Sequence, residues 1–279
     1  MKRKLILLSC LISSHLVAQQ DFLTEVYIQI IDLDEYYKPF AGSFVLLDLK
    51  TGEFKEYNDS IASIRYSPCS TFKIANSLIG IESGIAEDEK YNIEYDSLIN
   101  SPKPWWYTME PFKHWMQDHT MKSAIKYSVV WYYQELARRI GEKNMETLLR
   151  QINYGNNDIT SGIDNFWLCG SLKISAREQV EFLKRLYNKQ LFGLSDKTQG
   201  IVKDIMLYET TENYKLYGKT GSGDCWDDLL IGWYVGFLET DDNAYIFALN
   251  LFVNDFSDLD NNKRIELIKN ILKGLKIIE

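Results

Sequence analysis

The hydrophobic and polar positions of this chain predict β-strands near both of its ends. Residues 44–49 form a mostly apolar run, and residues 53–57 carry Phe54 and Tyr57 among charged side chains. The turn at residues 50–52 between them is typical of a β-hairpin. Later runs rich in aromatic and β-branched side chains, separated by glycine and Asp/Asn turns, predict further strands. These later runs are residues 214–220, 231–239 and 244–253. Together they indicate a largely antiparallel sheet.

Helical patterns fill the middle of the chain. A first helix is expected over residues 68–81, with Ser67 as its N-cap and Pro68 at the first helical position, where a missing N–H costs nothing. Gly84 is a suitable stop signal. Residues 88–165 are mostly helical in character, although three prolines interrupt them.

Three later helices are better defined by their ends or faces. Residues 123–140 are followed by Gly141, and residues 175–189 begin with Ser175 and Glu178 in the spacing of a capping box. Residues 263–276 predict an amphipathic helix at the end of the chain. The apolar side chains on one face of this last helix are Ile265, Ile268, Leu272 and Leu275.

The order of these elements predicts one α+β domain. Strands at both ends, with helices between them, indicate an antiparallel sheet built from both chain termini and packed with helices, plus an inserted all-helical lobe. A functional site would form in the cleft between the lobe and the sheet.

Residues 1–18 predict a signal peptide. A basic start is followed by a short apolar run, and we expect cleavage near Ala18. Whether Cys10 carries a lipid is left open by the sequence. The apolar run is too short to cross a bilayer securely, so no stable membrane span is expected. We therefore expect export to the periplasm and a mature catalytic domain of residues 19–279.

The composition excludes some partners. The chain has 279 residues, 46% of them hydrophobic, which is enough for one large domain. Its net charge is -8, and removal of the three basic residues of the signal peptide would lower it to -11. This acidity argues against nucleic acid and anionic membranes as partners. We expect a small-molecule partner, and the oligomeric state stays open between a monomer and a homodimer.

Three cysteines remain after signal removal, namely Cys69, Cys169 and Cys225. This odd number argues against a disulfide framework and allows at most one bridge. We expect Cys69 to be a small buried residue.

The candidate chemistry begins at the first helix. Ser70 falls in its first turn, where backbone N–H groups are unpaired and the helix dipole favours negative charge. Lys73 lies three residues later, so both side chains share one helix face. This pair is typical of a nucleophile and its base, although a Ser-x-x-Lys spacing alone also fits an ordinary surface helix.

Histidine is scarce, which narrows the choice of base. Only His114 and His119 survive signal removal, and neither has the neighbours of a metal ligand, so no metal is expected. His119 lies in a polar turn and is expected at the surface. Lys73 is therefore the candidate base for Ser70. Because lysine has a pKa of about 10.4, Lys73 must be desolvated or chemically altered to act.

Two further short motifs are weak when taken alone. Ser128 is followed by Val129 and Val130 within the predicted 123–140 helix; the alternative is a helix serine bonded to its own backbone. The second motif, Lys-Thr-Gly at 219–221, falls on a strand before an expected turn at 222–224. Its glycine, Gly221, would permit close approach of a ligand. The alternative is that Gly221 only marks the end of the strand.

In this order, Ser-x-x-Lys, Ser-x-Val and Lys-Thr-Gly resemble the signature of serine β-lactamases and penicillin-binding proteins. The Ser-x-Val form resembles the class D, or oxacillinase-type, β-lactamases. Other segments that resemble this family are Tyr154-Gly155-Asn156 and residues 164–168, 172–176 and 231–236. The resemblance covers residue 42 to the C-terminus and implies a β-lactamase/transpeptidase-like fold, an α/β/α sandwich.

The resemblance implies a role for each catalytic residue. Ser70 would attack the lactam carbonyl, and Lys73 would be the base, carboxylated by CO2 to N6-carboxylysine. Trp167 would donate its indole N–H to that carbamate. Ser128 would relay a proton to the lactam nitrogen, supported electrostatically by Lys219. CO2 or bicarbonate would be needed, and no other cofactor is expected.

The resemblance also implies how substrate would bind. Backbone N–H groups of Ser70 and Ser222 would form the oxyanion hole, and Arg264 would hold the substrate carboxylate. Trp115 would flank the cleft, with a core tryptophan as the alternative. The residues expected to contact substrate are Trp115, Val130, Thr220, Gly221, Ser222 and Arg264. Ser222 and residues 223–228 depart from the family pattern, which bears on substrate range.

The expected function is hydrolysis of penicillin-type antibiotics through a serine acyl-enzyme, giving antibiotic resistance. One alternative is a penicillin-binding sensor domain that acylates without turnover. Such sensors are joined to transmembrane helices and a signalling module, which this sequence lacks. The other alternative is a D-Ala-D-Ala peptidase, which the Ser-x-Val, Tyr-Gly-Asn and Trp167 features argue against.

Overall fold

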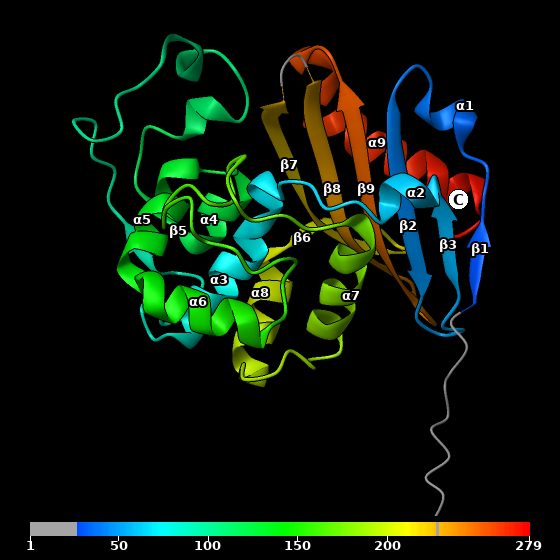
Figure 1. Ribbon diagram of the computed structural model, residues 1–279, viewed down its shortest axis with the longest axis horizontal. Helices are drawn as coiled ribbons and strands as arrows, with labels where there is room; N and C mark the ends of the chain where they lie inside the picture. Colours follow the sequence, from blue (N-terminus) through cyan, green and yellow to red (C-terminus); the bar gives the residue numbers. More distant parts are fainter. Residues whose placement is uncertain (1–26, 227–228) are drawn as a thin grey trace, which may run out of the picture.

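The computed structural model describes residues 27–226 and 229–279. The expected signal peptide, its cleavage position and Cys10 lie outside the described residues. A seven-stranded sheet has the order β1-β3-β2-β9-β8-β7-β6 (Figure 1). Among the helices of the described part, none combines the length and apolar character needed to cross a membrane.

The sheet is built from both ends of the chain, as the sequence predicts. Its strands are β1 (Ile28–Ile30), β2 (Ala41–Asp48), β3 (Phe54–Tyr57), β6 (Leu207–Thr210), β7 (Lys215–Trp226), β8 (Leu229–Glu239) and β9 (Ala244–Val253). β2 pairs antiparallel with both β3 and β9, so the two ends of the chain meet inside the sheet. β1 adds a parallel pairing with β3 that the sequence patterns did not predict.

Alternating side chains on β2 reach two separate cores. Phe44 and Leu46 pack in the core that contains α9 (Asn261–Gly274). Val45 and Leu47 point to the opposite face and join the larger core. This is the two-residue period of a strand buried on both faces. The expected apolar face of the last helix is confirmed, since Ile265, Ile268 and Leu272 are buried and Leu275 packs beside them.

The remaining helices lie on the other side of the sheet or in the lobe (Figure 1). They are α3 (Lys73–Glu82), α4 (Met121–Lys126), α5 (Val130–Ile140), α6 (Glu142–Gln151), α7 (Ala176–Tyr187) and α8 (Asp196–Ile205). α7 contacts β9, β2 and β8. Its predicted capping box is confirmed: Ser175 Oγ accepts from Glu178 N at 3.2 Å, and Glu178 Oε2 accepts from Ser175 N at 2.9 Å.

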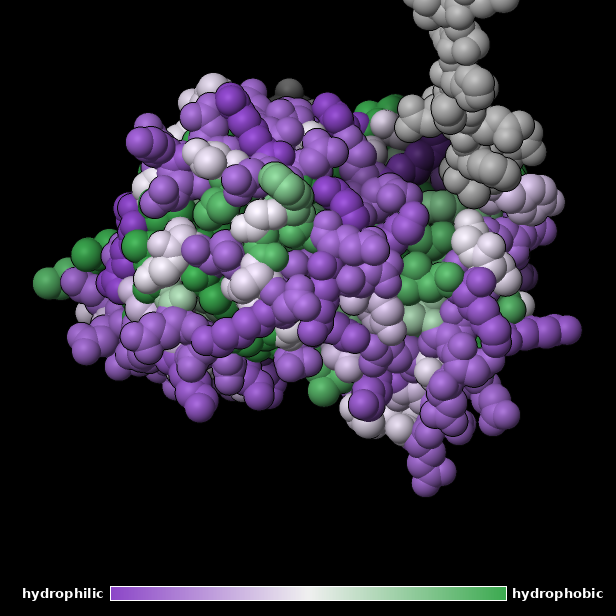
Figure 2. All heavy atoms as spheres, turned by 90° about the horizontal axis from the view of Figure 1, so that it is seen from below, coloured by the Kyte–Doolittle hydropathy of each residue, from purple (hydrophilic) through white to green (hydrophobic). Residues whose placement is uncertain are grey.

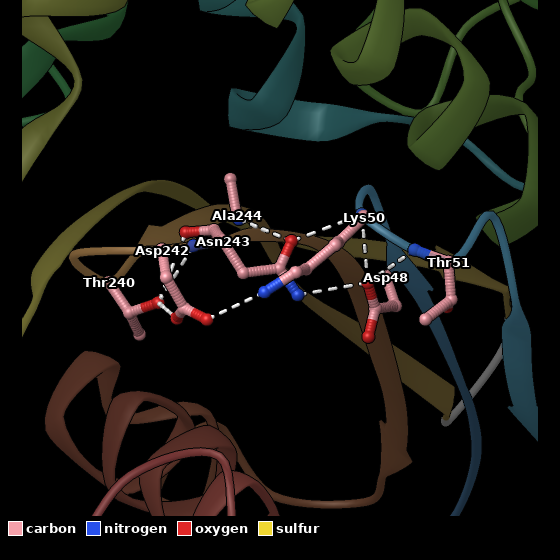
Figure 3. A network of polar contacts seen from close by, with 7 residues as sticks. All are labelled: Asp48, Lys50, Thr51, Thr240, Asp242, Asn243 and Ala244. Atoms are coloured by element: carbon pink, nitrogen blue, oxygen red, sulfur yellow. Dashed lines mark hydrogen bonds and ion pairs between the residues drawn. The ribbon is translucent and has the colours of Figure 1, made fainter.

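Figure 3 shows how the turn of the β2–β3 hairpin is fixed to the β8–β9 turn. Asn243 Nδ2 donates to Asp48 Oδ1 at 2.9 Å, and Lys50 N donates to Asn243 Oδ1 at 3.1 Å. Lys50 Nζ also pairs with Asp242 at 2.8 Å, an exposed ion pair that adds little by itself. The network fixes the relative register of the two central hairpins.

Two helical predictions are wrong. Residues 123–140 form α4 and α5 with a break between them, because Ser128 has a left-handed backbone (φ 55°) that a continuous helix cannot contain. Residues 88–118 hold only short elements, since prolines remove N–H donors and bend the chain. The other short elements of the described residues are α1 (Asp34–Tyr37), α2 (Asp59–Ala62), β4 (Asn92–Ile93), β5 (His119–Thr120), and the 3₁₀ turns η1 (Cys69–Phe72), η2 (Pro104–Tyr107), η3 (Phe112–His114) and η4 (Phe256–Leu259).

The expected turn at 222–224 is also wrong. β7 continues through these residues, and Ser222 pairs with Gly232 and Asp224 with Leu230 of β8. Pairing with a long, apolar neighbouring strand keeps this glycine-rich stretch extended. The substrate-side motif therefore lies within a strand instead of at its end.

The surface on the face drawn in Figure 2 is mostly hydrophilic, with apolar side chains scattered among polar ones. Such scattering is normal for folded proteins, whose polar groups cannot cover the whole surface. The apolar side chains are instead concentrated in the two cores on either side of the sheet.

Candidate active site

The structure brings Ser70 and Lys73 into direct contact. Lys73 Nζ donates to Ser70 Oγ at 2.7 Å. The local cause is the 3₁₀ turn η1, in which side chains three residues apart are eclipsed. Ser70 lies in that turn and Lys73 is the first residue of α3. The backbone of this turn therefore brings the two side chains to the same side.

Burial makes Lys73 an unusual lysine. Its side chain is fully buried (0% exposed), whereas Ser70 keeps partial access to solvent. Burial lowers the pKa of Lys73 to about 7, and the charge of a nearby Cys69 thiolate would oppose this only in part. A substantial fraction of this amine is therefore neutral near physiological pH and able to accept a proton.

Ser67 has a different role from the N-cap that the sequence predicted. Its Oγ donates to the carbonyl of Trp167 at 2.9 Å and accepts from Cys169 N at 3.0 Å. Its carbonyl accepts from Trp233 Nε1 at 2.9 Å. Ser67 thus ties the turn before the nucleophile to the Trp167 segment and to β8. Sequence patterns gave no signal for this positioning role of Ser67 and Trp233.

The Trp167 ring is fully buried beside the nucleophile helix. It packs against Phe72, with 5.3 Å between ring centroids, and against Phe166 at 4.9 Å. Its Nε1 is buried without a hydrogen-bond partner among the described residues. A buried N–H without an acceptor is costly, so this donor fits an acceptor group that binds in the site.

Ser128 lies in the break between α4 and α5, where its left-handed backbone frees the side chain from the helix. The helix-serine alternative is therefore not realised. The carbonyl of the preceding residue, Tyr127, is held in place by a hydrogen bond from Trp115 Nε1 at 2.9 Å. Trp131 Nε1 in turn donates to Trp115 O at 2.9 Å. Val130 follows as the first residue of α5 and is partly buried.

Trp115 does not flank an open cleft, contrary to the first of its two predicted roles. It is 7% exposed and packs against Trp106 and Phe112 with ring centroids 5.0 Å away in each case. The core alternative is the one the structure supports. The sequence showed only a tryptophan in a loop rich in aromatic residues, and burial of that loop decided its role.

β7 passes very close to the nucleophile turn. A Cβ added at Gly221 would lie 2.9 Å from the carbonyl oxygen of Pro68 and 3.2 Å from Thr71 N. The strand therefore approaches the turn at a distance that only glycine allows. The neighbouring Thr220 and Ser222 keep more access to solvent than Gly221 does. This arrangement places Ser222 N–H and Ser70 N–H on facing segments.

Lys219 is the second buried amine of the site. It is 5% exposed and donates to the carbonyl of Thr220 at 2.9 Å. Burial lowers its pKa well below the ordinary value, and the charges of Lys73 and Arg264 act in the same direction. Coupling between Lys73 and Lys219 means that protonation of one disfavours protonation of the other.

Arg264 is covered by the sheet instead of facing an open cleft. It is 1% exposed, and its guanidinium donates to the carbonyls of Gly221, Trp233 (3.1 Å) and Leu259 (2.8 Å). Burial lowers its pKa to about 10. The predicted direct contact with a substrate carboxylate would require this side chain to move. In the observed position Arg264 fixes β7 through Gly221.

His119 is not at the surface, contrary to expectation. It is 1% exposed, with Nδ1 2.8 Å from Ser123 Oγ and Nε2 2.8 Å from His114 O. Burial lowers its pKa below the ordinary value. His119 belongs to the short strand β5, which turns its side chain towards the interior. The polar residues around it in the sequence therefore gave the wrong prediction of exposure. Both ring nitrogens are engaged in local contacts that position α4.

The three cysteines meet near the nucleophile. Cys169 and Cys225 form a disulfide, which agrees with the limit of one bridge, and Cys69 is buried as expected. The three sulfur atoms lie within 4.8 Å of one another. Nothing in the spacing of these residues predicted the pairing, because it depends on the path of β7.

Comparison with known proteins agrees with this geometry. The family model of the penicillin binding protein transpeptidase domain matches residues 42–273. The probable β-lactamase YbxI of Bacillus subtilis (strain 168) is 39% identical over 239 residues, which cover 86% of this chain and 84% of that protein.

Two solved structures are also similar. The class D β-lactamase FUS-1 (OXA-85) from Fusobacterium nucleatum subsp. polymorphum has a TM-score of 0.78 and 38% identity, covering 86% of this chain and 94% of its own. The C-terminal domain of the Bacillus licheniformis BlaR penicillin-receptor has a TM-score of 0.82 and 31% identity, covering 92% of this chain and 100% of its own. On this evidence the chain belongs to the penicillin binding protein transpeptidase family and, within it, to the class D β-lactamases.

Proposed function

We propose that this protein hydrolyses the amide bond of penicillin-type β-lactams through an acyl-enzyme on Ser70. The observation that carries the proposal is the 2.7 Å contact between Lys73 Nζ and Ser70 Oγ, made by a lysine whose pKa is lowered to about 7. The Lys73 side chain takes the proton of Ser70 as Oγ attacks the lactam carbonyl carbon. The lactam C–N bond then breaks, and the nitrogen receives a proton through Ser128.

The nucleophile turn and β7, which face each other, would supply the groups that bind the substrate. The N–H groups of Ser70 and Ser222 would hold the oxyanion, each worth about 3 kcal/mol of barrier. The close approach of Gly221 to the Pro68 carbonyl supports this pairing, because it brings the strand next to the turn. Lys219, on β7, would support the Ser128 proton relay electrostatically. Arg264 would bind the substrate carboxylate together with Thr220 after its buried side chain moves.

We further propose that Lys73 carries a carbamate formed from CO2. Only a neutral amine reacts with CO2, and burial of Lys73 favours that form. The unpartnered Nε1 of Trp167 supports the same proposal, because it can hold a carbamate oxygen. When present, this group supplies an anionic oxygen base for acylation and for activation of the deacylating water. The aromatic wall of Phe72 and Trp167 excludes bulk solvent from it.

A penicillin-binding sensor is the second candidate, and one observation favours it. The BlaR penicillin-receptor domain is matched over its full length with a TM-score of 0.82. A sensor would be acylated at Ser70 and stay acylated. The two functions share the first chemical step and differ only in deacylation.

Turnover of a chromogenic cephalosporin separates the two candidates. We expect purified protein to hydrolyse many equivalents and to be faster with added bicarbonate. Ser70→Ala serves as the control and should form no acyl-enzyme. A single stoichiometric burst that leaves stable acyl-protein by intact mass would favour the sensor and overturn the hydrolase. Preparing the protein with residues 1–18 and sequencing its exported N-terminus tests the proposed export to the periplasm.

A further inference from the structure

A disulfide links two segments that each carry part of the proposed site. Cys169 lies two residues after Trp167, and Cys225 lies three residues after Ser222 near the end of β7. The sulfur of Cys69, the residue before the nucleophile, lies 4.0 Å from Cys225 Sγ. Three segments of the site therefore meet at one group of sulfur atoms.

β7 rests directly on these sulfur atoms. A Cβ added at Gly223 would lie 2.6 Å from Cys69 Sγ, 2.9 Å from Cys169 Sγ and 3.0 Å from Cys225 Sγ. Two residues earlier, Gly221 is as close to the Pro68 carbonyl. The separation of the strand from the nucleophile turn is therefore set by backbone contact with that turn and with the sulfurs.

Hydrogen bonds connect the Trp167 segment, which carries Cys169, to Ser67 just before the nucleophile turn. Cys169 N donates to Ser67 Oγ, and Ser67 Oγ donates to the Trp167 carbonyl. A closed path thus runs from the turn through the Trp167 segment and the disulfide to β7, and back to the turn. Opening the disulfide removes the covalent cross-link between the Trp167 segment and β7.

We propose that the Cys169–Cys225 disulfide is a positioning link of the active site, which holds β7 against the nucleophile turn and Trp167 against Phe72, the residue before Lys73. Its reduction slows acylation of Ser70 and weakens retention of the carbamate while the fold persists. This inference rests on the proposed function. It adds a redox-sensitive element that acts on the reacting groups through Ser222 and Trp167.

The redox step is simple. A dithiol reductant transfers two hydrogen atoms, giving two protein thiols and one disulfide of the reductant. Cys69 takes little part, because burial raises the pKa of its thiol to about 11 and leaves it protonated at neutral pH. We therefore expect reoxidation to restore the Cys169–Cys225 pair.

The test compares oxidised protein, protein reduced with dithiothreitol, and the double variant Cys169→Ala/Cys225→Ala. The rate of acylation by a penicillin is measured by intact mass, and turnover is measured against bicarbonate concentration. We expect about tenfold slower acylation in the reduced protein and in the variant, because small displacements of reacting groups are costly. Both should need more bicarbonate for half-maximal turnover.

Several controls make the outcome specific. Far-UV circular dichroism should be the same in all three samples, reoxidation should restore the rate, and the reductant should not change the double variant. Equal acylation rates and bicarbonate requirements in oxidised and reduced protein would refute this inference alone. So would loss of the circular dichroism signal on reduction, which would make the disulfide a plain stability element. A protein that never acylates would refute the proposed function together with this inference.

Discussion

At the scale of single residues, burial determines the chemistry of Lys73. The sequence identified the Ser70–Lys73 pair by its spacing, and the scarcity of histidine made Lys73 the candidate base. What the sequence could not provide was the solvent exposure of the amine, which is 0% in the fold. Burial is what lowers the pKa of Lys73 to about 7 and makes the proposed chemistry possible.

This low pKa has a consequence for stability. In the unfolded chain the lysine pKa is about 10.4. Between about pH 7 and that value the unfolded chain binds a proton that the folded chain does not, so folding stability from this group rises with pH. Below about pH 7 the folded protein must hold a buried ammonium.

We therefore expect Lys73→Met to be more stable than the parent protein at about pH 7, with the difference shrinking towards about pH 10. Urea unfolding in bicarbonate-free buffer at both pH values measures it, since the amine is then unmodified. Lys219 is present in the parent protein and in Lys73→Met, so its titration contributes to the pH dependence of stability in both. A stability difference that does not change with pH would show that Lys73 is not desolvated as described.

Other residue assignments show the same limit of sequence reasoning. Trp115, Arg264 and His119 were placed at a cleft or at the surface, and all three are buried. The family resemblance placed Arg264 at the substrate and offered Trp115 a cleft position beside a core one, whereas the polar turn around His119 suggested exposure. Their burial depends on segments distant in the chain, such as β7 over Arg264, which no local pattern reports.

At the scale of elements, the proposed site lies where helices are interrupted and where β7 approaches the nucleophile turn closely. Ser128 lies in the break between α4 and α5, and Ser70 in a 3₁₀ turn. The strands, the capping box of α7 and the face of α9 were predicted because they follow regular periods. The helix break and the extension of β7 were missed, since each depends on a backbone conformation or a partner strand.

The close packing of β7 on the sulfur atoms predicts the effect of one methyl group. Gly223→Ala would place a Cβ within 3.0 Å of all three sulfurs, so we expect it to lower the free energy of unfolding by about 1–3 kcal/mol. We also expect slower acylation, because β7 would be pushed away from the nucleophile turn. Urea unfolding and intact mass after mixing with a penicillin measure the two effects.

Gly200→Ala is the matched control. Gly200 lies within α8, and a Cβ added there meets no atom within 4 Å. Alanine at this position should raise the free energy of unfolding by up to about 1 kcal/mol, since glycine is unfavourable in helices. If Gly223→Ala behaved like this control, the strand would have room that the described packing does not give it.

At the scale of the whole molecule, the sheet joins parts of the chain that are far apart in sequence. Ser43 N donates to Asn250 Oδ1 at 2.8 Å across 207 positions, and β2 pairs with β9 along its length. The central strands carry β7 beside the helical lobe, and the nucleophile turn contacts both. The α+β architecture was predicted from the order of strand and helix patterns, and the family from three short motifs in order. The disulfide and the parallel β1–β3 pairing were not, because they arise only from the assembled fold.

A carbamate on Lys73 can be detected directly by ¹³C NMR of protein equilibrated with ¹³C-bicarbonate. We predict a carbamate resonance in the parent protein and none in Lys73→Ala. In Trp167→Phe, which removes the unpartnered N–H and keeps the ring, the resonance should be weaker at the same bicarbonate concentration and recover at a higher one. A parent protein that hydrolyses β-lactams rapidly but shows no carbamate resonance at saturating bicarbonate would contradict the account, because Lys73 would then act as a plain amine.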